Sequence, residues 1–301
     1  MLLPICQLFI PNPSIIIKIN EITTTLPVGP RMTRPFPRGW VWVGIVLALI
    51  ALLALLIVAP PPLLRKLDYI GAAVCHRLPS HSFFINEHQL PICQRCTGTF
   101  SGALTGIIVQ WVVLRRRREQ GFPALKYLLL FGLFAAMWGG DGFNSFLGMR
   151  FNNDNGLLYM PQPGIRLLTG ILMGLGMSAI LVPAFNLTLW ADGTPAPVLR
   201  SWRDLATLLL SGLAVGALIF TLSPWLLYPA ALYSTLGVLA MFTCLGAMMF
   251  VMAIGRENTC TGWRTAWVPL VWGFVFAALI VAVMDTLRWL ATGTLDGFPL
   301  L

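Results

Sequence analysis

The chain has 301 residues, of which 57% are hydrophobic and only 10% are charged, and its mean hydropathy is +0.79. A water-soluble globular domain carries about a quarter charged residues, so this composition excludes that class. The net charge of +9 accompanies long apolar segments, and it therefore indicates membrane topology and lipid headgroups as partners rather than nucleic acid.

Residues 1–38 differ from the rest and are interpreted as an N-terminal tail. They are rich in proline, and they lack the small-residue cleavage site of a signal peptide. Met32 precedes a basic segment that leads into the first apolar run. Two interpretations stay open: Met32 is the true start of the protein, or the whole segment is a disordered tail.

Seven apolar runs follow, each of a length suited to an α-helix that crosses a bilayer, which takes about 20 residues. They are Gly39–Ala59, Gly98–Leu114, Ala124–Gly140 or beyond, Ile165–Leu189, Leu205–Leu222, Leu226–Ile254 and Trp263–Ala291. The runs are continuously apolar, whereas the strands of a membrane β-barrel alternate. The predicted fold class is therefore all-α, a polytopic transmembrane helical bundle of about seven spans, with residues 39–301 forming one transmembrane domain.

The distribution of Lys and Arg predicts the orientation, because the cytoplasmic ends of spans carry an excess of these residues. With the N-terminus in the cytoplasm, 13 of the 20 lie inside and seven lie outside. The run Arg115–Arg118, directly after the second apolar run, is the strongest single indication. We therefore expect a multi-pass protein of the cell membrane whose loop at residues 60–97 is extracytoplasmic.

This loop contains all three histidines of the chain and three of its six cysteines. These residues are Cys75, His76, His81, His88, Cys93 and Cys96. Thiolates and imidazoles bind zinc and other soft metals, and three cysteines with one histidine form a common tetrahedral zinc set. The sequence therefore predicts a zinc ion or another soft divalent metal held by the three cysteines and one histidine.

Two alternatives to a metal stay open for the same cysteines. The Cys93-x-x-Cys96 pair is also typical of thiol–disulfide redox chemistry, and an oxidising compartment permits a plain structural disulfide. A c-type haem is excluded because Thr97 stands where the attachment motif needs histidine. We also expect that the adjacent Cys75 and His76 do not easily bind one ion together, which would leave His81 or His88 to complete the set.

The same window resembles an uncharacterised, predicted integral-membrane family, catalogued as domain of unknown function number two thousand and eighty-five. The matching residues are Cys75, His76, Pro79, Ser82, Phe83, Pro91, Cys93, Arg95, Cys96 and Gly98. The resemblance covers about residues 70–180 and implies membrane architecture but no activity. It favours His76 as the histidine ligand, because the family usually has arginine at the position of His81 and His88 lies outside the motif.

A second polar cluster lies at the end of the third run and the start of the fourth. Asp141 and Asn144 form one part, Arg166 and Thr169 form the other, and they resemble a second signature of the same family. Ionisable groups in apolar spans face a bundle interior, a partner or a cavity. The sequence leaves open a buried Asp141–Arg166 ion pair or a carboxylate that serves the metal, in both cases near Arg95 of the cysteine motif.

Small residues four apart let transmembrane helices approach closely. Such ridges occur in the second and fourth runs and consist of Gly98, Gly102, Gly106, Gly170 and Gly174. They predict close packing of these two runs, with Cys96 and Arg166 at one membrane level. In the last run, Asp285 and Arg288 are spaced for an intrahelical ion pair.

No nucleotide-binding or zinc-protease motif is present, and no internal repeat supports a transporter fold. The predicted function is an integral membrane protein of unknown activity with a soft-metal site in an extracytoplasmic loop, as an accessory subunit of a membrane complex. One alternative is a membrane enzyme that acts on a lipid or quinone by redox or metal chemistry. A second alternative is a small-solute transporter.

Overall fold

The computed structural model describes residues 36–58, 62–151 and 158–295. Met32 and nearly all of the predicted tail lie outside these residues. The described residues belong to one compact unit, Arg34–Leu301, which contains eight helices in its described part. The helices are α2 (Arg38–Val58), α3 (Leu63–Ala72), α4 (Gln94–Ile108), α5 (Leu125–Arg150), α6 (Pro163–Leu189), α7 (Trp202–Phe220), α8 (Leu227–Ala253) and α9 (Trp263–Thr292).

The all-α membrane bundle predicted from the sequence is confirmed. Within the described ranges, six helices are long and apolar enough to cross a membrane, namely α2, α4 with the π-helical turn Val109–Val113, α6, α7, α8 with its preceding turn Pro224–Leu226, and α9. Helix α5 occupies the place of the remaining predicted span and has 26 residues. It is not among the six, since its second half contains the polar stretch from Gly139 to Asn144.

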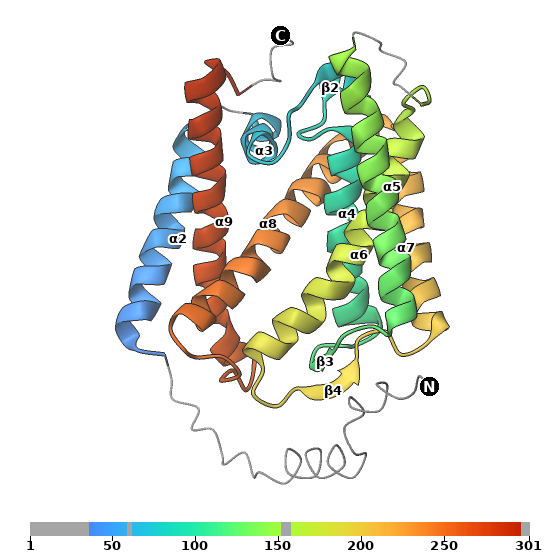
Figure 1. The fold of residues 1–301 in the computed structure, drawn as a ribbon. Coiled ribbons are helices and arrows are strands. Elements are labelled where there is room, and N and C mark those ends of the chain that lie inside the picture. The colour runs from blue at the N-terminus through green and yellow to red at the C-terminus, as the bar shows by residue number, and fades with distance from the viewer. Residues whose placement is uncertain (1–35, 59–61, 152–157, 296–301) are drawn as a thin grey trace, which may run out of the picture. The chain divides into compact units, whose positions relative to one another are not determined.

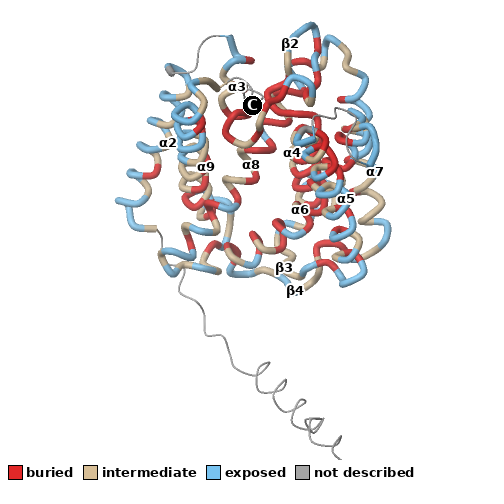
Figure 2. The backbone as a smooth tube through the Cα atoms, turned by 45° about the horizontal axis from the view of Figure 1, so that its top comes forward, coloured by how far each residue is buried: buried red, intermediate tan, exposed pale blue. Residues whose placement is uncertain are grey.

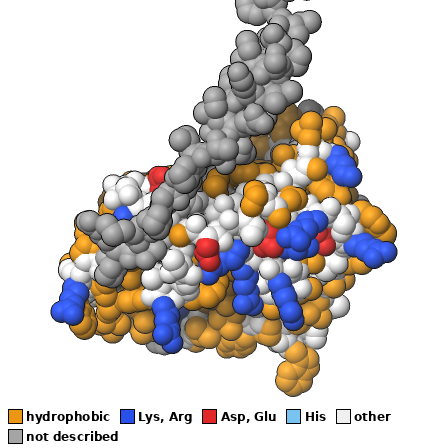
Figure 3. Space-filling view, turned by 90° about the horizontal axis from the view of Figure 1, so that it is seen from below, with side chains coloured by type: hydrophobic (Ala, Val, Ile, Leu, Met, Phe, Trp, Pro, Cys, Tyr) orange, Lys and Arg blue, Asp and Glu red, His pale blue; other side chains and the backbone are white. Residues whose placement is uncertain are grey.

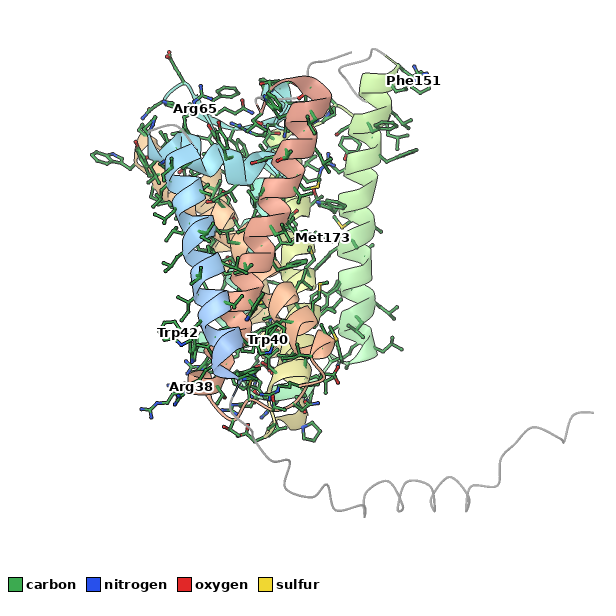
Figure 4. All side chains as sticks on the ribbon, turned by 90° about the vertical axis from the view of Figure 1, so that its left-hand side faces the viewer. Arg38, Trp40, Trp42, Arg65, Phe151 and Met173 are labelled. Carbon is green, nitrogen blue, oxygen red and sulfur yellow. The ribbon has the colours of Figure 1, made fainter. Side chains whose placement is uncertain are left out.

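The long helices run between two ends of this unit (Figure 1). The cysteine–histidine loop and α3 lie at the upper end, where Figure 4 also places Arg65 and Phe151. The lower end holds Arg38 and Trp42. Buried residues concentrate on α4, α6 and α8, whereas α2 is largely exposed (Figure 2).

In the described part of the chain, two short pairs of strands lie in the loops, one pair at each end of the bundle. At the upper end, β1 (Phe84–Ile85) and β2 (His88–Gln89) form an antiparallel hairpin. Its turn residues Asn86 and Glu87 have φ angles of 50° and 62°, as a type I′ turn requires. At the lower end, β3 (Glu119–Gly121) pairs in parallel with β4 (Thr194–Pro197) and ties the segment after α4 to the segment after α6.

Cationic side chains surround the lower face (Figure 3). The exposed ones at this end are Arg38, Arg115, Arg117, Lys126, Arg200, Arg203 and Arg264. Most cations assigned to the inside by the sequence thus share one end of the bundle, opposite the cysteine–histidine loop. This arrangement supports the orientation inferred from the Lys and Arg count, which we retain as a proposal.

Helices α4 and α6 form the most extensive helix pair in the structure, because glycines remove side chains from their interface. A Cβ atom at Gly98 or Gly102 would meet the carbonyl oxygen of Leu167 or of Ile171 on α6. On α6, a Cβ atom at Gly170 or Gly174 would meet backbone atoms of α4 in the same way. The close crossing holds the start of α4, with Cys96, beside the start of α6, with Arg166.

Replacing Gly174 by alanine should destabilise the bundle. The added Cβ would overlap the carbonyl oxygen of Thr99 and come within 2.6 Å of the Ala103 nitrogen. Overpacking of this kind costs about 1–3 kcal/mol, and backbone atoms cannot yield cheaply. Gly132→Ala is the matched control, because within the described ranges no atom outside the adjoining backbone of α5 lies within 4 Å of its Cβ position. Equilibrium unfolding in detergent should show a loss of stability for Gly174→Ala only. Equal stability of the two variants would contradict the close contact between α4 and α6.

Candidate metal centre

The cysteine–histidine window is held between two helices at the upper end. Cys75 and His76 lie in the segment after α3, which ends at Ala72. Cys93 is the N-cap residue of α4, and Cys96 lies in the first turn of that helix. The chain between them forms a short 3₁₀ turn and the β1–β2 hairpin, which folds the two halves of the window together.

Three potential ligands converge in this window. One ligand atom each from Cys75, His76 and Cys93 lies within 4.8 Å of the others. The Cys75 Sγ and His76 Nδ1 atoms are 4.0 Å apart. Tetrahedral zinc bonds of about 2.3 Å to sulfur and about 2.0 Å to nitrogen imply a separation of about 3.5 Å. A shift of a few tenths of an ångström would therefore suffice for Cys75 and His76 to share an ion, although the sequence led us to expect that adjacent residues do not easily do so.

The Cys75 sulfur is an acceptor at the centre of the window. It accepts hydrogen bonds from the backbone N–H groups of Cys93 at 3.2 Å and Arg77 at 3.5 Å. Hydrogen bonds from the Cys93 and Cys96 thiols hold the pKa of Cys75 well below its usual range, against the effect of burial. Donation to Cys75 in turn raises the pKa of Cys93. Cys75 is therefore the cysteine of this group that ionises most readily, and thiolates are the form that binds soft metals.

Cys96 lies beside the three converging residues. Its thiol hydrogen-bonds to Cys75, although the group of three mutually close ligand atoms does not include it. The five cysteines of the described ranges, including Cys244 and Cys260, are free thiols. The converging group therefore has three members, and Cys96 is the adjacent candidate for a fourth ligand.

The other two histidines occupy different positions. The rings of His76 and His81 pack edge to face with centroids 5.7 Å apart, and burial lowers the pKa of His81 to about 4. His81 is thus a neutral neighbour of the converging group and not part of it. His88 is exposed on β2.

The histidines provide a direct test of this geometry. We expect His76→Gln to lower zinc affinity by at least about tenfold, since one of the ligands in a zinc set is lost. His88→Gln is the control, because His88 is exposed on the hairpin. Competition with a chelating dye would measure both affinities, and equal losses in the two variants would show that His76 is not a ligand.

The polar cluster of α5 and α6 adjoins the start of α4. Asp141 is buried, and its Oδ2 accepts from Arg95 Nε at 3.0 Å. Its Oδ1 accepts from the Tyr159 hydroxyl at 2.6 Å. Partial burial and this hydrogen bond raise the pKa of Tyr159 to about 12, so the phenol remains a donor. The carboxylate of Asp141 therefore pairs with Arg95, rather than with Arg166 as one interpretation of the sequence had it.

Arg166 is joined to this cluster through neutral groups. Its guanidinium donates to Ser145 Oγ at 3.2 Å and to Gln94 Oε1 at 3.4 Å, while Arg95 donates to the same Ser145 Oγ at 3.3 Å. A bridging serine thus stands where the sequence suggested a direct ion pair. Asn144 and Thr169 have local roles: Asn144 bonds the backbone of Leu158 and Tyr159, and Thr169 bonds carbonyls of its own helix.

Residues that sequence reasoning missed hold the loop in place. Arg77 pairs with Asp68 of α3 at 2.9 Å, and Arg288 of α9 donates to loop carbonyls rather than to Asp285. No hydrogen-bond partner of Asp285 Oδ1 is found among the described residues. Arginines close to apolar helix ends were the available signal, but Arg288 bonds backbone oxygens, which no sequence motif reveals.

The fold and this window define a polytopic α-helical membrane protein with a cysteine–histidine cluster. Residues 75–180 match the family model described as "Predicted membrane protein (DUF2085)", which confirms the resemblance seen in the sequence. The match spans the ligand window, α4, α5 and most of α6. No solved structure matches the chain.

Two uncharacterized archaeal proteins are similar to this chain. A protein of Methanocaldococcus jannaschii is 28% identical over 118 residues, which cover 38% of this chain and 66% of that protein. A protein of Methanothermobacter thermautotrophicus is 28% identical over 107 residues, which cover 36% of this chain and 83% of that protein. The chain thus spans slightly less than two thirds of the first relative, and neither name carries an activity.

Proposed function

We propose that this protein binds a zinc-like divalent metal through Cys75, His76, Cys93 and Cys96, in a loop on the extracytoplasmic side of the cell membrane. The observation that carries the proposal is the convergence of the first three ligands within 4.8 Å. Cys96 supplies the third sulfur and the fourth ligand. Four protein ligands fill a tetrahedral zinc site, which is the arrangement of structural rather than catalytic zinc.

The metal would fix the connection between α3 and α4. Cys75 and His76 follow α3, whereas Cys93 and Cys96 begin α4. A structural ion there stabilises the upper end of the bundle, and it suits an accessory subunit that presents a rigid outer surface to other membrane subunits.

Metal analysis of the purified protein tests this proposal. We expect about one zinc-like ion per chain, as a four-ligand structural site holds one ion. The double variant Cys93→Ser with Cys96→Ser should lose it. Metal-free wild-type protein, together with a double variant that expresses and folds normally, would rule the proposal out.

The second candidate is a membrane enzyme that uses the Cys-x-x-Cys pair as redox thiols on a lipid or quinone. Its support is the Cys-x-x-Cys spacing of Cys93 and Cys96 at the start of α4, which is typical of thiol–disulfide redox pairs. Alkylation of cells before and after reduction would distinguish the two. Thiols that never cycle between dithiol and disulfide exclude the redox enzyme, and a cycling pair excludes the structural metal.

The geometry gives less support to the transporter. The burial of Asp141 is accounted for by its contacts with Arg95 and Tyr159. A carboxylate paired in this way requires no aqueous path.

A further inference from the structure

Arg288 reaches from α9 into the ligand loop. Its Nη1 donates to the carbonyl oxygens of Ala72 at 2.8 Å and Cys75 at 2.6 Å. Its Nη2 donates to the carbonyl oxygen of His76 at 3.0 Å. The side chain is buried, and the contact joins segments more than 200 positions apart in the chain. One guanidinium thus binds the backbone of both adjacent ligands.

The contact suits the geometry of an arginine side chain. The last carbonyls of a helix lack intrahelical partners, and Ala72 is the last residue of α3. A guanidinium presents five N–H donors in a fixed planar fork, whereas a lysine ammonium is a compact charge on a flexible stem. The fork is thus preorganised to hold three carbonyls of a turning chain in one arrangement.

A second arginine fixes the same segment to α3. Arg77 pairs with Asp68 at 2.9 Å and has a φ of 52°. In this left-handed conformation its backbone N–H points to the Cys75 sulfur. The loop is therefore anchored to α3 through Arg77 and to α9 through Arg288, with Cys75 and His76 between the two anchors.

We infer that Arg288 is a positioning residue of the metal centre, which makes α9 part of the site although it lies outside the residues that match the family. The inference rests on the proposed metal function. Groups that orient metal ligands without touching the ion typically contribute 10–100-fold, roughly, to metal affinity. Arg288 does so through the backbone carbonyls of Cys75 and His76.

Zinc affinities of three variants in the full-length protein test this role. We expect Arg288→Met to bind zinc about 10–100-fold more weakly, and Arg288→Lys to lose less, because lysine can hold part of the contact. The control is Arg264→Met, which removes an exposed cation from the opposite end of α9. With cobalt(II) in place of zinc, the Arg288 variants should show an altered ligand-field spectrum, which a general loss of stability would not produce.

A metal-independent readout separates this inference from the proposed function. Cys75 is only 6% exposed, so its alkylation in chelator-treated protein reports how firmly the loop is held. We expect faster alkylation of Cys75 in Arg288→Met and, to a smaller extent, in the folded Arg288→Lys variant. If wild-type protein binds no metal, the proposed function fails. The alkylation rate of Cys75 alone then decides whether Arg288 positions the backbone of Cys75 and His76. Wild-type alkylation rates in both Arg288 variants would overturn the inference, as would unchanged zinc affinity with an unchanged cobalt spectrum.

Discussion

Cys75→Ser should abolish stoichiometric zinc binding. Cys75 accepts two backbone hydrogen bonds and the thiol protons of Cys93 and Cys96, and it is therefore the hub of the cluster. The binding free energy of a structural zinc ion is about 10–16 kcal/mol. If each of the four ligands contributes an equal share, the loss of one ligand lowers the zinc affinity by about 100-fold or more. Elemental analysis and dye competition on the purified variant would measure the loss.

Cys244→Ser is the matched control for this experiment. Cys244 lies in α8 and, like Cys75, is a free cysteine that is 6% exposed. We expect the control to keep the metal content of the wild type. Equal metal content in the Cys75 and Cys244 variants would show that the cluster is not a metal site.

Asp141→Asn should cause the largest loss of stability among single changes in the polar cluster. The carboxylate is buried, and it is bonded by Arg95 and Tyr159. An amide in its place leaves the guanidinium of Arg95 without its counter-charge. Breaking a buried ion pair by removing one partner costs about 3–5 kcal/mol. Equilibrium unfolding in detergent would measure the difference.

An exposed ion pair provides the control variant. Asp192 pairs with Arg118 but is mostly exposed, so Asp192→Asn should change stability by no more than about 1 kcal/mol. Zinc affinity should stay close to wild type in both variants, because the Asp141 oxygens bind Arg95 and Tyr159. A large loss of zinc affinity in Asp141→Asn would instead favour a carboxylate that serves the metal.

The helices could be predicted from the sequence because bilayer-spanning runs are local features. A stretch such as Leu205–Leu222 carries its own signal of length and hydropathy. The glycine spacing of Gly170 and Gly174 likewise predicts a close helix contact, and the structure places α4 backbone atoms against both residues. The short helix α3 lies within the predicted loop and could not be seen in the same way, because its 10 residues are too few for a span.

The pairing of charges could not be predicted, because it depends on the rotation of each helix in the bundle. Asp141 of α5 meets Arg95 of α4 because both helices pack against α6, while Arg166 reaches Ser145 and Gln94. Arg288 was assigned to Asp285 by sequence spacing alone. Its true partners are carbonyl oxygens of Ala72, Cys75 and His76, which carry no mark in the sequence.

The most direct test of the central claim is the metal content of the full-length wild-type protein, measured by mass spectrometry together with a count of thiols after chelation. A structural zinc site predicts about one zinc-like ion per chain, with Cys75, Cys93 and Cys96 all reactive as thiols once the ion is removed. Protein with only trace metal, in which two of these cysteines form a disulfide, would contradict it.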